Sequence, residues 1–166
     1  MALVALTIAS TITYVSDRDP SKQVVDVPID PEDLSKGAKK ETRIGDGATK
    51  FFLKPLDVFL KGYIYDNATH LVGKSGTDDV GIHTRINQTN IDAVRFGLAG
   101  FENFSDASGN PVKFKTVKDN VNGREYDAVA TDVLNTLGLE LIGELASQIK
   151  SASEVSAEEA KNSEPA

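Results

Sequence analysis

The sequence predicts a single small α+β domain, in which an antiparallel sheet is packed by two short helices and one long C-terminal helix. Three observations predict this class. Apolar residues recur at every fourth position from Val129 to Ile149, which is the spacing of one face of a helix. Two earlier segments, 5–15 and 48–54, are rich in the β-branched and aromatic residues typical of strands. A chain of 166 residues is long enough for one hydrophobic core, so we expect one domain over 1–150.

The expected strands are bounded by residues that interrupt a sheet. In residues 5–15, Leu6, Ile8, Ser10, Ile12 and Tyr14 alternate with Thr and Ala, a pattern typical of a half-buried strand. The segment 48–54 stops at Pro55, which has no amide hydrogen to continue a ladder. A third strand, 112–117, is expected after the turn-forming residues 105–111. We expect the first two strands to pair as an antiparallel hairpin with a long arm at its tip.

The expected helices follow from capping residues and apolar spacing. Asp57 stands at an N-cap position before apolar residues at helical spacing, which predicts a short helix over 57–67. Asn90 is expected to cap a second helix over 90–101, on which apolar residues form one stripe. The strongest signal predicts the closing helix, 127–150.

Residues 17–47 are rich in Pro, Asp and Gly, and their short apolar run holds Val24, Val25 and Val27. This composition predicts a long, extended arm between the first two strands. Connections longer than about 12–15 residues are uncommon unless they bind something or are disordered. We therefore expect the arm to lie against another chain in an assembly, with the three valines as candidate partner contacts.

The closing helix supplies a second set of candidate partner contacts, Leu141, Leu145 and Ile149. Two interpretations of its apolar face stay open, because it is either the core helix of this domain or a helix whose stripe a partner subunit completes. The tail, 151–166, has four Glu against one Lys. It is expected to be either a solvated acidic segment or a docking peptide.

Charge and composition exclude several classes of partner. The chain has 18 Lys and Arg against 25 Asp and Glu, for a net charge of −7. It therefore lacks the basic character that a general nucleic-acid binder needs. No stretch approaches the roughly 20 apolar residues that span a bilayer, and the apolar opening has no basic residue before Arg18, as a signal peptide would. We expect neither nucleic acid nor membrane as a partner.

No residues form a pattern that predicts catalysis, a cofactor or a metal. The chain has no Cys, which removes disulfides, thiolate zinc sites and Cys nucleophiles. Residues 68–90 are expected to form a polar, Gly-rich loop. Its Gly73-Lys74-Ser75 segment lacks the earlier Gly of a phosphate-binding loop. His70 and His83, with Asp79 between them, lack the ligand spacing of a zinc site. A hydrolase or nucleotide-binding enzyme is a third class of function, and it would require a pocket with converging polar groups.

Three segments together resemble a group of small tailed-bacteriophage proteins from the structural and tail-assembly genes. The first is 49–56, an aromatic strand that ends in a Lys-Pro-Leu corner. The second is 97–104, a Gly-Leu-Ala-Gly-Phe-Glu-Asn-Phe stretch, with the Asp-x-x-Gly-Asn turn and returning strand of 106–114. The third is the closing helix with the acidic segment that ends at 159–163. The chain departs from the family in its longer arm and in Phe101, where Trp is commoner.

The resemblance implies a role in assembly and brings no catalytic residues with it. It implies a non-enzymatic virion structural protein that mediates subunit contacts in head, neck or tail, made in the host cytoplasm. Its partners would be other phage structural proteins, with this chain as a homo-oligomer or multi-copy ring. The alternative is a tail-assembly chaperone that escorts tail proteins and is absent from the mature particle. Phe52, Pro55, Phe101 and Phe104 are expected to anchor the fold.

Overall fold

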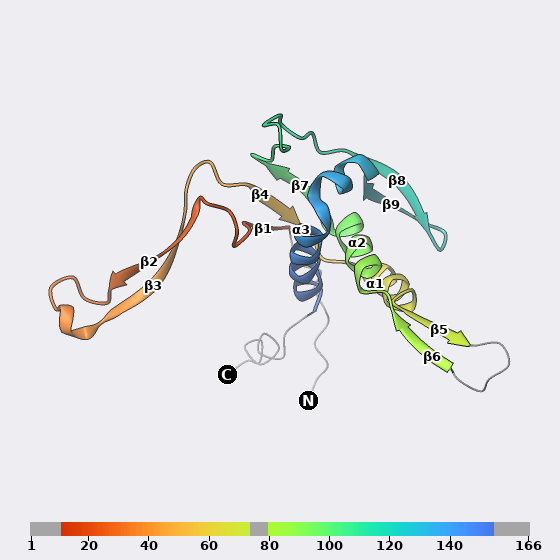
Figure 1. The fold of residues 1–166 in the computed structure, drawn as a ribbon, viewed down its shortest axis with the longest axis horizontal. Coiled ribbons are helices and arrows are strands. Elements are labelled where there is room, and N and C mark those ends of the chain that lie inside the picture. Colours follow the sequence, from red (N-terminus) through yellow and green to blue (C-terminus); the bar gives the residue numbers. More distant parts are fainter. Residues whose placement is uncertain (1–10, 74–79, 155–166) are drawn as a thin grey trace, which may run out of the picture.

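The computed structural model describes residues 11–73 and 80–154, and it has the predicted α+β fold (Figure 1). The strands are β1 (Ile12–Tyr14), β2 (Lys22–Pro28), β3 (Ala38–Ile44), β4 (Lys50–Leu53), β5 (Thr69–Gly73), β6 (Val80–Thr84), β7 (Leu98–Glu102), β8 (Thr116–Val121) and β9 (Arg124–Val129). The helices are α1 (Val58–Asp66), α2 (Ile86–Gly97) and α3 (Thr131–Ala152). None of these described helices is both long and apolar enough to cross a bilayer.

A three-stranded antiparallel sheet in the order β1-β4-β7 supports the core. Tyr14 pairs with Phe51, which confirms the expected pairing of the first two strands; the part of strand 5–15 before residue 11 lies outside the described residues. Phe51 is fully buried, whereas Phe52 is half-buried. Because neighbouring residues of a strand face opposite sides, the core anchor of β4 is Phe51, and Phe52, the residue expected in this role, lies outside the core cluster.

The centre of the core is the contact between α2 and α3, the most extensive contact between helices. Ala93 and Gly97 of α2 and Ala146 and Ile149 of α3 are all buried. A Cβ atom on Gly97 would lie 2.6 Å from Cγ2 of Ile149. Glycine at 97 therefore sets how closely the two helices approach.

The third strand of the sheet is β7, where the sequence analysis expected the end of helix 90–101. α2 begins earlier, at Ile86, and the backbone becomes extended at Leu98. Leu98 is buried and Phe101 is half-buried, but both belong to the strand. The expected helix end is wrong because a short apolar run fits a buried strand as well as a helix face.

The hairpin of β8 and β9 corrects the expected strand 112–117, whose bounds are wrong. β8 begins only at Thr116 and pairs with β9 through a turn at Asn122 and Gly123. Both turn residues have positive φ, 51° and 84°, as a type I′ hairpin turn requires.

The closing helix is confirmed, with a later start and an interruption. α3 begins at Thr131 and not at 127, because the residues up to Val129 belong to β9. Gly138 has φ 74° and ψ 158°, which breaks the helical path inside α3. The next residue, Leu139, is left 59% exposed. Beyond α3, residues 155–166 of the expected acidic tail lie outside the described residues.

The short helix predicted over 57–67 is confirmed as α1. The carboxylate of Asp57 caps it by accepting from the Leu60 amide at 2.8 Å. The same carboxylate accepts from the Tyr126 hydroxyl at 2.9 Å, which ties the start of α1 to β9. The inner face of the helix is buried at Leu60 and Ile64.

Two hairpins project from opposite sides of the core (Figure 1). β5 and β6 form one of them, with His70 opposite His83, so the loop expected over 68–90 is wrong for the described residues. Gly73, Gly76 and Gly81 interrupt this segment, so its sequence resembles that of a loop. Lys74, Ser75 and Asp79 lie outside the described residues. β2 and β3 form the other hairpin, within the predicted arm.

Gly97→Ala is expected to lower the free energy of unfolding by about 1–3 kcal/mol, because its methyl group would overlap the Ile149 side chain. Gly62→Ala in α1 is the matched control, since no atom lies within 4 Å of its Cβ position. That change should stabilise the protein by up to about 1 kcal/mol, the helix preference of Ala over Gly. Urea unfolding measures both. A Gly97→Ala variant as stable as the control would contradict the close helix contact.

Candidate interaction surface

The longest projection is residues 22–44, here called the arm, and its base is fixed by hydrogen bonds. The Asp19 carboxylate accepts from the amides of Ser21 and Thr49, both at 2.8 Å. The Gly45 amide donates to the Ser21 carbonyl at 2.8 Å. Burial would raise the pKa of Asp19, but the bonds that its carboxylate accepts hold the pKa below its ordinary value. The arm therefore leaves the core at a defined point.

A second set of contacts joins the arm base to α3. The Tyr14 hydroxyl donates to Glu144 at 2.7 Å, and Arg18 pairs with Glu140 at 2.7 Å and with Glu144 at 3.5 Å. Burial raises the pKa of Tyr14, and the bond to Glu144 raises it further. For Glu144, burial would raise the pKa, but the bonds from Tyr14 and its neighbours and the charge of Arg18 hold it below its ordinary value.

The part of the arm formed by β2 and β3, residues 22–28 and 38–44, is here called the stem. It is a two-stranded ribbon, and among the described elements no third strand and no helix packs on it. All residues of β3 are exposed. Val25 and Val27 are half-buried and lie opposite Glu41 and Lys39, while Val24 faces the other side and is exposed. An isolated hairpin of this kind is at best marginally stable in water.

The tip of the arm, residues 29–37, is both apolar and acidic. Leu34 is 74% exposed and Ile29 is 58% exposed. Asp33 caps a single 3-10 turn by accepting from the Ser35 amide at 3.1 Å. The Lys36 ammonium bonds Asp30 at 2.6 Å and holds the pKa of that carboxyl below its ordinary value.

A shallow hollow of about 520 Å³ lies where the start of α2 meets the interruption of α3, and is here called the α2 hollow. Its lining residues are Arg85, Ile86, Asn87, Gln88, Ile91 and Leu139. Ile86 is 64% exposed. Beneath it, Gln88 donates to the buried Asp92 at 3.1 Å, and burial raises the pKa of that carboxyl. Open apolar walls of this kind suit side chains of another protein better than an enclosed small molecule.

The outer face of α1 is a second exposed apolar surface, formed by Val58, Phe59 and Tyr65. The Arg124 guanidinium lies 3.5 Å from the centre of the Phe59 ring, in a cation–π contact. α1 is apolar on several sides, which is typical of a helix covered all round.

The predicted partner contacts divide into two groups. Val24, Val25 and Val27 lie on the projecting stem. Leu145 and Ile149 are fully buried against the chain's own core, and the interpretation of α3 as the core helix holds for them. Leu141 is half-buried and packs against that core.

Sequence reasoning missed the exposed apolar residues at the arm tip and in the α2 hollow. Ile29 and Leu34 are single apolar residues next to Pro or acidic residues. In such a context an isolated apolar residue forms no periodic pattern, so the sequence does not predict an apolar surface there. Ile86 and Leu139 lie together only because the start of α2 meets the break in α3 at Gly138. Two signals were available in the sequence: the Asn122-Gly123 pair, which marks a hairpin turn, and the Gly in mid-helix.

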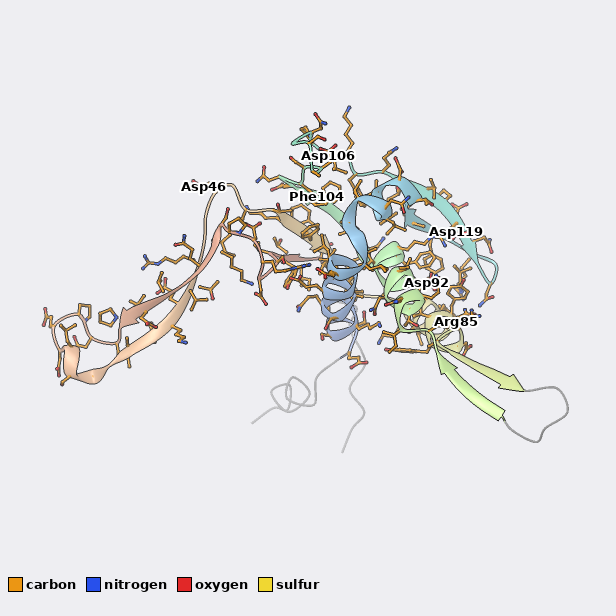
Figure 2. All side chains as sticks on the ribbon, viewed as in Figure 1. Asp46, Arg85, Asp92, Phe104, Asp106 and Asp119 are labelled. Atoms are coloured by element: carbon orange, nitrogen blue, oxygen red, sulfur yellow. The ribbon has the colours of Figure 1, made fainter. Side chains whose placement is uncertain are left out.

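Residues of the first two segments that carry the phage resemblance pack together at the end of β7. Phe101 packs edge-to-face against Phe51, Phe104 and Phe114, with ring centres 6.3, 5.0 and 5.5 Å apart. Asp106 accepts from the amides of Ser108 and Asn110, both at 2.9 Å, and closes the turn. Phe101 and Phe104, two of the expected fold anchors, pack against the core, and β4 ends at Leu53, two residues before Pro55. In Figure 2 the turn at Asp106 lies near Phe104 at the rim of the core.

The described residues contain no group of three or more Asp, Glu or His arranged to hold a metal ion. No protein-family model, curated protein or solved structure matches the chain. The resemblance to small phage proteins therefore depends on the quoted segments alone.

Glu144→Gln is expected to destabilise the protein at neutral pH, because a neutral amide holds Tyr14 and Arg18 less strongly than the carboxylate does. The folded-state pKa of Glu144 is lowered, so its contribution is present above the unfolded-state pKa and is lost as pH falls through the folded-state value. Urea unfolding measured at a series of pH values should therefore give its largest difference at neutral pH, and the difference should decline as the pH falls below the ordinary pKa range of Glu. Glu140→Gln is the control, because its carboxylate is 86% exposed and such pairs contribute little. Equal effects of the two variants would contradict the assigned role of Glu144.

Proposed function

We propose that this chain is a non-enzymatic structural protein of a tailed-bacteriophage virion, where it joins subunits in head, neck or tail. The observation that carries the proposal is the arm, a projecting ribbon whose β3 residues are all exposed and whose tip presents Ile29 and Leu34 to solvent. The resemblance of three sequence segments to phage assembly proteins supports the same reading.

The energetics of the arm support a function in contact with other chains. A two-stranded ribbon gains little stability alone and becomes stable when a third strand or a helix packs on it. Burying a side chain such as Leu34 in a neighbouring subunit would gain about 1.5–3 kcal/mol. The base of the arm is held by Asp19 and Glu144, so its position relative to the core is set before a partner binds.

A tail-assembly chaperone is the second candidate, and the outer face of α1 favours it. Val58, Phe59 and Tyr65 are exposed on one helix, and exposed apolar patches of this kind mark sites that bind other proteins. A chaperone would cover an unassembled tail protein with such a surface and then leave it.

Mass spectrometry of purified phage particles decides between the two candidates. A virion protein is expected in the particles, in the several copies per particle that a ring or tube of subunits requires. A chaperone is expected to be absent from them and to co-purify with an unassembled tail protein. Absence of the chain from mature particles would contradict the proposed virion role.

Replacing residues 22–44 by Asn-Gly is expected to leave a folded chain that no longer enters particles. The Ser21 carbonyl and the Gly45 amide are already bonded at 2.8 Å, so they can serve as the first and fourth residues of a two-residue hairpin turn. Deleting all of 18–46 would also remove Asp19 and Arg18, which hold the core side of the base.

Circular dichroism and particle composition measure the two expectations separately. The matched variant keeps the stem and changes only the tip, by Ile29→Ser with Leu34→Ser. Normal incorporation of the shortened chain would contradict a role for the arm, and loss of folding would show that the arm belongs to the core.

A further inference from the structure

Resting on the proposed function, we infer that the arm tip of one copy docks into the α2 hollow of a second copy. The tip provides two exposed apolar side chains, Ile29 and Leu34, on a narrow projection. The hollow provides exposed apolar walls at Ile86 and Leu139. An apolar projection on one subunit can therefore be buried in an apolar hollow on another.

The two surfaces are complementary in charge. The tip carries three acidic residues, Asp30, Glu32 and Asp33, against one cation, Lys36. The hollow is lined by Arg85, the N-cap residue of α2.

The start of α2 strengthens this complementarity. Its N-cap residue, Arg85, makes no side-chain bond to the first amides, and its first turn holds no acidic residue. The amino end of a helix carries unsatisfied donors and partial positive charge, which acidic residues from the tip would satisfy. The acidic neighbour on α3, Glu140, is already paired with Arg18 at 2.7 Å.

The positions of the two surfaces favour a second copy over a contact within one chain. Figure 2 places Asp46 at the base of the arm and Arg85 on the far side of the core. The arm extends away from the core (Figure 1), so its tip does not reach the hollow of its own chain. A contact between two different surfaces is heterologous, and repeated copies then close into a ring or extend as a filament.

Disulfide cross-linking tests the pairing directly, because the natural chain has no Cys. Leu34→Cys with Ile86→Cys in one chain should give a ladder of cross-linked dimers, trimers and larger species under oxidising conditions. Either single variant should give dimers at most. All substituted positions are exposed, so folding should be unaffected.

The matched controls move the acceptor cysteine to other exposed sites. Leu34→Cys with Val117→Cys, on the β8–β9 hairpin, should give no ladder. Leu34→Cys with Phe59→Cys tests the outer face of α1 as an alternative acceptor. A ladder from the Phe59 pair in place of the Ile86 pair would overturn the proposal, and so would a wild-type chain that stays monomeric at millimolar concentration.

A charge reversal provides an independent readout. Arg85→Glu should weaken self-association several-fold in sedimentation equilibrium, and adding Glu32→Arg in the same chain should restore it. Glu32 is chosen because Asp30 and Asp33 hold the structure of the tip itself.

Failure of this pairing is distinguishable from failure of the proposed function. If the Asn-Gly arm variant is lost from particles while Ile86→Glu and Arg85→Glu chains enter them normally, the arm binds elsewhere and the proposed function stands. If wild-type chains are absent from particles but the Leu34→Cys, Ile86→Cys chain forms the ladder, the docking stands and the virion role does not.

Discussion

The contact between α2 and α3 is the constraint on which the rest of the structure depends. Ala93 and Gly97 on one helix and Ala146 on the other leave room for Ile149 to lie against the α2 backbone. Because core packing is dense, even one added methyl group there must displace a neighbour. The sheet, α1 and the β8–β9 hairpin are arranged around this pair, and α2 also contacts each of α1, β7 and β9.

Because the buried residues gather around α2 and α3, a large part of the chain lies outside the hydrophobic core. The arm is a continuous ribbon of 23 residues, 22–44, that buries little of its own surface, yet its base is tied to the core through Asp19, Tyr14 and Glu144. The arm differs from a flexible linker, because hydrogen bonds fix the point at which it leaves the core while no other described strand or helix packs on its strands. The chain therefore holds an apolar tip at a defined distance from its core, which is useful only where something else receives the tip.

Sequence predicted the elements whose signals are local and missed those decided by tertiary contacts. Asp57 and the apolar spacing after it located α1, and the pairing of β1 with β4 followed from two strand-like segments around an arm. β7 was mistaken for helix because Leu98 and Phe101 fit either pattern. The helix ends where the Leu98 backbone becomes extended and pairs with Leu53 of β4, a tertiary contact. The surface was the least predictable part of the structure. Val24, Val25 and Val27 indicated an arm in the sequence, but the α2 hollow depends on the interruption of α3 beside Leu139, which is a tertiary feature.

The break at Gly138 connects the core to the surface. A regular α3 would carry its apolar residues on one buried stripe, and a left-handed glycine instead redirects the chain so that Leu139 stands beside Ile86. With φ at 74°, a residue with a side chain would be strained at this position. Glycine is thus required at 97 for the close approach of the helices and at 138 for the hollow above them. The same pair of helices that stabilises the monomer consequently shapes the surface on which a neighbouring chain would rest.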